Sequence, residues 1–271
     1  MIKRNLLGLP IYDVRMEELI NLVEKYIDEN KRTIIFGIGF GSYGEIKWRK
    51  EFIAFFNKID IIIADGQGIP ILGKIFNIQV VEHIGIVNLS NKILSLANER
   101  SYKILLFGTT KELNEIANEN VKKKYPNIRL CSGINGFFSP NEELSIIEKI
   151  NKEKPDILFI GISSPIKERF ALKYKNILKT KVIIPCGGYL DVLAGKEKRP
   201  AINFKWFPTT WFYRFLQSPK LFKSTVYPVF YFGIKVLPIL LFKHFLNIER
   251  NPSILKYYGH NLDEIKSSYK Y

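Results

Sequence analysis

Short, uninterrupted apolar runs recur through the first two thirds of the chain and constrain its fold more than any other feature. They read DIIIA, KILLF, DILFIG and VIIP, and they are rich in β-branched residues. A strand covered by helices on both faces has this continuous pattern, whereas a strand with one solvated face alternates apolar and polar residues. The runs therefore predict buried strands over 33–38, 60–64, 102–107, 128–131, 156–161 and 182–185.

Amphipathic segments separate these runs. Leu113, Ala117 and Val121, for example, recur at helical spacing between two of the predicted strands. Such segments predict helices over 16–29, 111–124, 142–152 and 166–178. The alternation predicts an α/β fold, with a doubly wound, mostly parallel sheet and helices on both faces. Ligands of such sheets bind beyond the C-terminal ends of the strands, so the residues that follow each strand are the candidate site.

The composition changes near residues 195–203, which divides the chain into a predicted α/β core over 1–200 and an appendage over 201–271. The whole chain has a net charge of +15. Residues 196–271 hold 13 basic and 4 acidic side chains, so +9 of that charge lies in the last quarter. A balance this basic predicts an acidic partner, such as phosphates, nucleic acid or an anionic membrane.

The appendage combines aromatic and cationic residues. Trp206 and Trp211 interleave with lysine and arginine, a mixture that suits the headgroup level of an anionic membrane. Lys235 and Lys243 interrupt the apolar runs, which favours a helix lying in the interface over one that crosses the bilayer. Packing against the core or against another subunit is the alternative interpretation, because buried aromatic residues are common.

Several classes of protein are excluded by simple counts. Cys131 and Cys186 form no CxxC motif and no metal-binding spacing with the three histidines, so neither a disulfide framework nor a metal site is expected. Free cysteines are natural in a reducing cytosol. No stretch has the roughly 20 apolar residues of a spanning helix. The basic charge would also fit a nucleic-acid-binding protein, but the sequence contains no recognised binding module.

The segment IIIADGQGIP places Asp65 at the tip of a predicted strand. Gly66 and Gly68 permit a tight turn and a close approach of the backbone to a ligand. A carboxylate in this position can act as general base on a sugar hydroxyl. The alternative is that Asp65 shapes the turn or caps the next helix.

Two further strand ends could bind an anion through backbone amides. In LLFGTTKEL, Gly108 ends a strand, and Thr109 and Thr110 open a helix whose N-terminus suits a diphosphate. In VIIPCGGYLD, Gly187 and Gly188 again open a helix after a strand. The alternatives are threonine capping at the first site and a close helix–strand crossing, which only glycine allows, at the second.

The segment ILFIGISSPIKERF carries polar groups from a strand end into a helix. Ser164 lies in the loop, Pro165 suits the first helical position, and Lys167, Glu168 and Arg169 fall in the first turn. These charges either face the same crevice or form an ordinary solvated helix start.

Six segments in this order resemble the WecG/TagA/CpsF glycosyltransferases, which form glycosyltransferase family 26. The segments are LLGLPIYDVRMEEL, ADGQGIP, LLFGTTKEL, PDILFIGISSPIKERF, CGGYLDVLAGKEKRP and TWFYRFLQSPKL, and the resemblance covers roughly residues 5–223. It implies a Rossmann-like core and a C-terminal, membrane-associating helical appendage. Some members associate, so a homo-oligomer is one alternative to a single chain.

The resemblance also implies a reaction. A hexose or an N-acetylhexosamine, such as N-acetylmannosamine, would pass from a UDP-sugar to a polyprenyl-diphosphate-linked sugar, with inversion and without a metal or cofactor. The enzyme would be cytoplasmic and peripheral on the inner face of the cell membrane. Its product would serve a capsule, an exopolysaccharide or a teichoic acid.

The resemblance assigns roles to particular residues. Asp65 matches the proposed catalytic base of the family's DG motif. Without a metal, helix N-termini and cations must balance the charge of the leaving UDP. The donor and its phosphates would contact Gly66, Gly108, Thr109, Thr110, Ser164, Lys167, Glu168, Gly187 and Gly188. The acceptor or its diphosphate would contact His83, Arg199 and Arg214.

The sequence departs from the family at several of these positions. The Thr-x-Asn motif after the first strand has no match in TIIFGIGFGS. His83 stands where the family has arginine, Asn88 where it has aspartate, and Lys167 where it has glutamine, although Glu168 is kept. Lys167 could supply the positive charge lost with the arginine. A second hypothesis is therefore a weak or inactive member that serves as a scaffold of a polysaccharide assembly complex.

Overall fold

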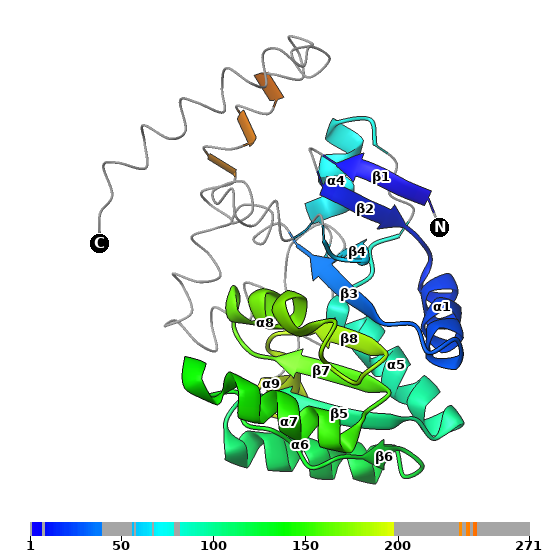
Figure 1. Ribbon diagram of the computed structural model, residues 1–271. Coiled ribbons are helices and arrows are strands. Elements are labelled where there is room, and N and C mark those ends of the chain that lie inside the picture. The colour runs from blue at the N-terminus through cyan, green and yellow to red at the C-terminus, as the bar shows by residue number, and fades with distance from the viewer. Residues whose placement is uncertain are drawn as a thin grey trace, which may run out of the picture.

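The computed structural model describes residues 2–6, 9–39, 56, 58–66, 68–78 and 82–197, together with 233–234, 237–238 and 241–242. Its centre is a six-stranded sheet with the order β4-β3-β8-β7-β5-β6, in which every pair of neighbouring strands is parallel (Figure 1). The strands are β3 (Thr33–Ile38), β4 (Ile61–Ala64), β5 (Lys103–Gly108), β6 (Arg129–Leu130), β7 (Ile157–Gly161) and β8 (Val182–Pro185). The predicted α/β sheet is confirmed, with strand bounds that differ by two residues at most.

Helices cover both faces of this sheet. Successive strand residues point to opposite faces, so Phe36 belongs to one buried cluster and Ile35 to the other. The first cluster also contains residues of α4 (Gly68–Ile75), α7 (Glu143–Glu153) and α8 (Ile166–Tyr174). The second contains residues of α1 (Met16–Asp28), α5 (Ile86–Arg100), α6 (Lys111–Lys124) and α9 (Tyr189–Leu193). A short 3-10 helix, Pro140–Glu142, precedes α7.

The sequence did not predict two strands and one helix. The antiparallel hairpin of β1 (Ile2–Leu6) and β2 (Leu9–Asp13) precedes the core. Helix α5 was not predicted either, although its buried residues recur at helical spacing along one broad face. Those residues are Val87, Leu89, Ser90, Ile93, Leu94, Leu96 and Ala97.

Helix α8 ends four residues earlier than predicted, at Tyr174 instead of residue 178. The Arg32 guanidinium binds the carbonyl oxygen of Asn176 at 2.6 Å, and the amide of Leu178 donates to the Tyr174 carbonyl at 2.8 Å. Leu178 is fully buried. The apolar spacing that suggested a longer helix therefore reflects a turn that returns Leu178 to the core.

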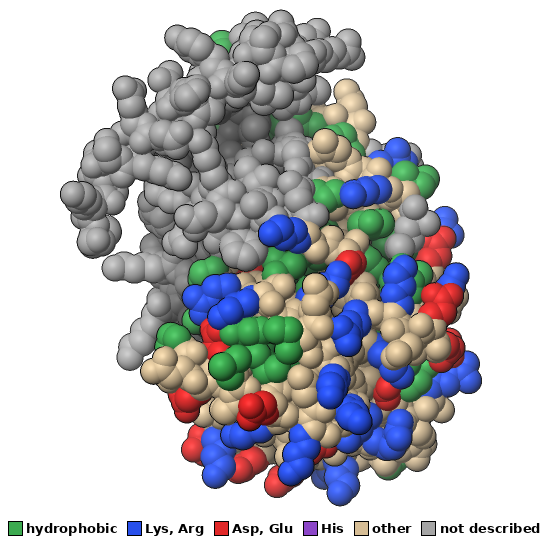
Figure 2. All heavy atoms as spheres, in the orientation of Figure 1, with side chains coloured by type: hydrophobic (Ala, Val, Ile, Leu, Met, Phe, Trp, Pro, Cys, Tyr) green, Lys and Arg blue, Asp and Glu red, His purple; other side chains and the backbone are tan. Residues whose placement is uncertain are grey.

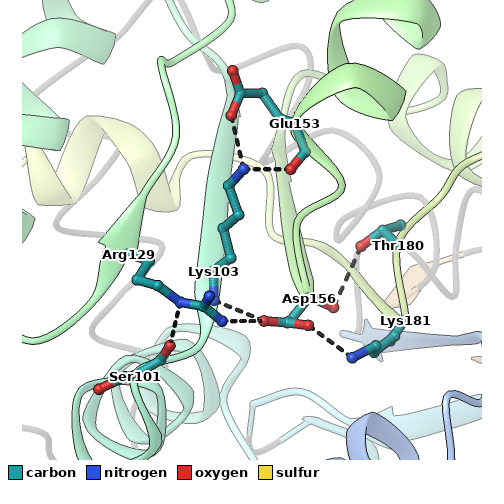
Figure 3. A network of polar contacts seen from close by, with 7 residues as sticks. All are labelled: Ser101, Lys103, Arg129, Glu153, Asp156, Thr180 and Lys181. Atoms are coloured by element: carbon teal, nitrogen blue, oxygen red, sulfur yellow. Dashed lines mark hydrogen bonds and ion pairs between the residues drawn. The ribbon is translucent and has the colours of Figure 1, made fainter.

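A network of ion pairs joins the N-terminal ends of four strands (Figure 3). The Asp156 carboxylate accepts hydrogen bonds from the Lys103 amide at 2.8 Å and from Lys181 Nζ at 2.9 Å, and Arg129 Nη2 lies 3.5 Å from it. Lys103 Nζ also pairs with a Glu153 carboxylate oxygen at 3.1 Å. These contacts hold β5, β6, β7 and β8 together at this edge, which is opposite to the edge where ligands of such sheets bind.

Most of the predicted appendage lies outside the described residues. Its described positions are helical, and Leu237 and Leu241 pack against the buried cluster of α4, α7 and α8. Ile234 and Phe242 are 68% and 64% exposed. Among the described residues, no helix is both long enough and apolar enough to span a bilayer. The division into a core and an appendage at residue 200 stays a prediction.

Candidate active site

Asp65 lies directly after β4, and the neighbouring strand fixes its position. The Asp65 amide donates to the Ile38 carbonyl at 2.8 Å, which extends the pairing of β4 with β3. A Cβ added to Gly37 would lie 3.1 Å from the Cβ of Asp65. Gly66, with a φ of +76°, then turns the chain away. The glycine at position 37 therefore leaves room for the aspartate beside the end of β3.

The Asp65 carboxylate contacts the N-terminus of α5. Its Oδ1 accepts a hydrogen bond from the Ile86 amide at 3.1 Å, and Ile86 is the first residue of that helix. A negative charge is favourable at this end of a helix. Asp65 therefore caps a helix with one carboxylate oxygen, as the alternative interpretation predicted. The capped helix is α5, however, and not the adjacent α4. The contact also fixes the direction of the carboxylate, as a general base requires.

The segment before α5 brings His83 and Asn88 into the same part of the fold. A Cβ added to Gly85 would lie 3.7 Å from Asp65 Oδ1 and 3.9 Å from Asn88 Nδ2. The side chains of His83 and Asn88 are exposed. The Ile84 amide donates to the Ala64 carbonyl at 2.7 Å, so two of the positions at which this sequence departs from the family, His83 and Asn88, lie near the proposed base.

Lys167 and Glu168 turn inward from the start of α8. Glu168 is 3% exposed, and its Oε1 accepts hydrogen bonds from Ser164 Oγ at 3.1 Å and from Lys167 Nζ. Its Oε2 is buried and has no hydrogen-bond partner in the described part of the chain. Arg169 differs, since it is exposed and pairs with Glu143 of α7 at 3.1 Å. The interpretation that these charged side chains face the ligand-binding crevice therefore fits Lys167 and Glu168 but not Arg169.

The Lys167 ammonium lies beside β3. Its Nζ is 5.2 Å from the centre of the Phe36 ring, on β3. Burial raises the pKa of the Cys186 thiol, and the positive charge of Lys167 acts in the opposite direction. Cys186 directly follows β8. One cation is thus held at the middle of the sheet, close to the strand that supports Asp65.

The amides at the end of β5 are already engaged. The Gly108 amide donates to the Ile134 carbonyl at 2.8 Å, and the Thr109 amide donates to the Gly161 carbonyl at 3.2 Å. Thr110 Oγ1 accepts the Leu113 amide at 3.3 Å, so threonine capping of α6 is confirmed. The first two amides therefore brace strand ends, and the geometry does not support their predicted use for a diphosphate.

A contact that the sequence did not predict joins the end of β5 to α9. Thr109, with a φ of +53°, directs its Oγ1 to Asp191 Oδ1 at 2.5 Å. Asp191 lies on the short helix after Gly187 and Gly188. The place of Asp191 after the two glycines was the only feature of the sequence that pointed to this residue. No sequence pattern links Asp191 to a threonine 82 residues earlier.

The first glycine before α9 is needed for its backbone conformation. Gly187 has a φ of +56°, and a Cβ added there would meet nothing within 4 Å. A close helix–strand crossing lies at Gly161, where an added Cβ would lie 2.8 Å from Leu190 Cδ1. The close crossing offered as an alternative is therefore not at Gly187, and the use of Gly187 and Gly188 for an anion stays a prediction.

Because the strands are parallel, all these groups lie along one edge of the sheet. In strand order, Asp65 follows β4, Lys167 and Glu168 follow β7, and Thr109 follows β5. Neighbouring strands are about 4.8 Å apart, so the line from β4 to β5 is roughly 19 Å long.

Arg199 and Arg214 lie outside the described residues. The described residues include no group of three or more His, Cys, Asp or Glu side chains arranged for a metal.

The chain matches a known family over most of its length. The model described as "Glycosyl transferase WecG/TagA/CpsF family" matches residues 4–244. This range includes every predicted site residue.

Several curated relatives are similar to the chain. A protein of Bacillus spizizenii is 26% identical over 216 residues, which cover 78% of this chain and 82% of the relative. One of Staphylococcus aureus is 27% identical over 194 residues, which cover 72% of each. One of Bacillus subtilis is 24% identical over 214 residues, which cover 78% of this chain and 82% of the relative. All three are named N-acetylglucosaminyldiphosphoundecaprenol N-acetyl-beta-D-mannosaminyltransferase.

Proposed function

The chain belongs to the WecG/TagA/CpsF family of glycosyltransferases, and on this basis we propose that it transfers a sugar from a UDP-sugar to a polyprenyl-diphosphate-linked sugar. The sugar moved is a hexose or an N-acetylhexosamine similar to N-acetylmannosamine. The names of the relatives support an acceptor of this kind, since they describe transfer to a diphosphoundecaprenol-linked N-acetylglucosamine. The product would enter a capsule, an exopolysaccharide or a teichoic acid.

The observation that carries the proposal is the position of Asp65. Its carboxylate lies at the ligand-binding edge of the sheet, and the Ile86 amide at the start of α5 fixes its direction. In the proposed reaction it accepts the proton of the acceptor hydroxyl as that oxygen attacks the anomeric carbon. The bond between the anomeric carbon and the diphosphate oxygen breaks, UDP leaves, and the configuration at the anomeric carbon inverts.

Lys167 is the described cation best placed to balance the charge of the leaving UDP. An ammonium group has three N–H donors, so its contact with Glu168 leaves donors for phosphate oxygens. Glu168 holds the ammonium beside β3 and itself accepts a hydrogen bond from Ser164. A hydrogen-bond donor that is already in position lowers the reaction barrier, because it does not have to reorganise during the reaction.

We place the nucleoside of the donor near Thr109 and Asp191. Asp191 already accepts the hydroxyl of Thr109, and a carboxylate at a strand end is also suited to accept a ribose hydroxyl. This end of the site is about four strand spacings, roughly 19 Å, from the strand that carries Asp65. The donor would then lie along the edge of the sheet, with its sugar towards β4.

The acceptor side of the proposal involves the appendage and an anionic membrane surface at the cytoplasmic face. Arg199 and Arg214 would contact the acceptor diphosphate. The exposed Ile234 and Phe242 support an apolar contact with lipid, because Leu237 and Leu241 of the same segment face the core. Removal of residues from 203 onward should weaken binding to anionic vesicles at least tenfold in a co-sedimentation assay. Equal binding by the shortened chain would contradict a membrane role for the appendage.

A panel of UDP-sugars with a short polyprenyl-diphosphate-N-acetylglucosamine acceptor tests the function. Mass spectrometry should detect an acceptor heavier by one sugar residue with one donor of the panel. The absence of product with every donor, despite measurable UDP binding, would favour the scaffold hypothesis, which the unmatched Thr-x-Asn motif supports. Binding to duplex DNA that weakens steeply with salt would favour the nucleic-acid alternative.

A further inference from the structure

Helix α4, the first element after Asp65, is apolar on both of its faces. Its sequence is GIPILGKI, and Ile69, Leu72 and Gly73 form the buried inner face. A helix on a protein surface normally has one polar face, whereas a helix that is apolar all round lies inside a protein or in a membrane. The outer face of α4 therefore requires a partner that the described part of the chain does not supply.

The outer face of α4 carries two exposed isoleucines and a lysine. Ile71 is 54% exposed and Ile75 is 38% exposed. Lys74 is exposed as well. Positions 71, 74 and 75 share one side of the helix, because residues three and four apart are neighbours on a helix surface. We call this side of the helix, formed by Ile71, Lys74 and Ile75, the α4 surface.

The α4 surface lies next to the N-terminal hairpin, and the two carry basic but no exposed acidic side chains. Leu6 and Ile11 of the hairpin belong to the same buried cluster as the inner face of α4. Lys3 of the hairpin is exposed. Asp13 is the only acidic residue of β1, β2 and α4, and it is 8% exposed and pairs with Arg4 at 3.4 Å. Figure 2 shows hydrophobic and basic side chains, and no acidic ones, over the hairpin and α4 in this view.

The described part of the appendage adds exposed apolar side chains to the same region. Leu237 and Leu241 pack against the buried cluster that contains the inner face of α4, whereas Ile234 and Phe242 are exposed. Figure 1 shows these appendage positions, coloured orange, at the same end of the molecule as α4. The core and the appendage thus both present apolar side chains to the solvent at this end.

The charge of the α4 surface favours a lipid surface over a second copy of the chain. In a symmetric dimer the same surface meets itself, so the two copies of Lys74 would approach each other without an exposed carboxylate of α4 or the hairpin to pair with. Lysine is also depleted in protein–protein interfaces. At an anionic membrane the isoleucines can enter the apolar layer while the lysine reaches the headgroup phosphates.

We infer that the α4 surface contacts an anionic membrane directly, as a second attachment besides the appendage. The inference rests on the proposed function, because a polyprenyl-linked acceptor has its lipid part in the membrane. Helix α4 begins at Gly68, three residues after Asp65, so at most about 11 Å of chain separates the proposed base from the start of this helix. Contact of α4 with the bilayer therefore keeps the base close to the membrane surface, where the acceptor sugar lies.

A fluorescent label at position 71 tests the inference in the full chain. Ile71→Cys can be labelled selectively with nitrobenzoxadiazole, a dye that senses its environment, because Cys131 and Cys186 are both buried. Vesicles of phosphatidylcholine and phosphatidylglycerol should shift the emission to shorter wavelength. A nitroxide on the lipid acyl chain should quench it.

The matched control is Ile177→Cys with the same label. Ile177 is 55% exposed, as much as Ile71. It lies at the opposite edge of the sheet, where the neighbouring Asn176 contacts Arg32 just before β3. The vesicles should not change the emission of a label at this position.

Charge substitutions measure how much the α4 surface contributes to binding. Ile71→Glu should weaken co-sedimentation with the anionic vesicles about tenfold or more, because an isoleucine side chain no longer leaves water. Ile177→Glu should bind like the unaltered chain, with melting curves to show that both variants fold. Lys74→Gln should weaken binding less and should reduce the preference for anionic over neutral vesicles.

Several results would overturn the inference. They are an unchanged emission at position 71, equal changes at positions 71 and 177, and a dimer in sedimentation velocity that Ile71→Glu dissociates while vesicle binding stays the same.

Sugar transfer separates this inference from the proposed function. Ile71→Glu should transfer sugar to the short acceptor in solution at the original rate, but about tenfold more slowly to an acceptor embedded in vesicles. Equal rates with the embedded acceptor would contradict the inference. If no donor supports transfer while the label at position 71 enters the membrane, the proposed function is contradicted and the membrane contact of α4 is not.

Discussion

The two edges of the central sheet are held together by different means. At the N-terminal edge, charged side chains tie strands to one another, with Asp156 contacting Lys103, Lys181 and Arg129 (Figure 3). At the C-terminal edge, backbone amides and closely packed glycines hold the strands together, for example where Gly108 packs against Gly161. The charged groups of the C-terminal edge are thus not needed to join strands, which leaves them available for a substrate.

The same contrast appears in how completely polar groups are paired. Both carboxylate oxygens of Asp156 have partners at 2.8–3.5 Å. Glu168 uses one oxygen for Ser164 and Lys167, and its other oxygen has none among the described residues. An incomplete buried group costs stability. For these two carboxylates, the difference supports a stabilising role for Asp156 and the proposed functional role for Glu168.

The largest effect on stability is expected at the N-terminal edge. Asp156→Ala removes the acceptor of the Lys103 amide and leaves two cations, Arg129 and Lys181, without their common anion, so it should lower the free energy of unfolding by about 2–3 kcal/mol. Denaturant unfolding measures this. Sugar transfer at a temperature well below the melting transition should stay near the original rate.

Glu148→Ala is the control for that variant, because Glu148 is exposed on α7 and outside the network. It should change the free energy of unfolding by no more than about 0.5 kcal/mol. If the Asp156 variant lost transfer activity without losing stability, the division between the two edges would be incorrect.

A smaller effect, on catalysis, is expected from Lys167. Lys167→Gln keeps a hydrogen-bond donor for Glu168 but removes the positive charge, and it should lower kcat/KM for the UDP-sugar about tenfold. If Lys167 replaces the arginine that the family has at position 83, His83→Arg in the same chain should restore most of the loss. Steady-state kinetics of the two single variants and the double variant would show this. Additive losses would contradict compensation.

The smallest effect concerns the far end of the helix that carries Lys167. Burial acts to raise the pKa of Glu143, but hydrogen bonds from Lys173 and Tyr174 and the charge of Arg169 outweigh it and lower that pKa below its usual value. A carboxylate with a lowered folded-state pKa stabilises the fold above its unfolded pKa near 4.5, and this stabilisation is lost as the pH falls through the folded value.

The melting temperature should therefore fall more steeply between about pH 5 and pH 3 in the unaltered chain than in Glu143→Gln. Scanning calorimetry at a series of pH values measures the two slopes. Parallel slopes would show that Glu143 does not anchor α8 through its charge.

The sequence predicted the sheet well because burial on two faces leaves a continuous apolar run, as in KILLF. It could not predict that Asp65 would meet Ile86 or that Thr109 would meet Asp191, because such contacts depend on strand order. It could not tell a glycine required for positive φ, such as Gly187, from one required for close packing, such as Gly161, because the two look alike in a sequence.

The most direct test of the central claim replaces the carboxylate of Asp65 without disturbing its cap. In Asp65→Asn the carboxamide oxygen can still accept the Ile86 amide, so the melting temperature and the affinity for UDP should stay near those of the original chain. The single-turnover rate of sugar transfer should fall at least ~100-fold, the usual contribution of a general base. A rate within about threefold of the original would contradict the assignment of Asp65 as the base.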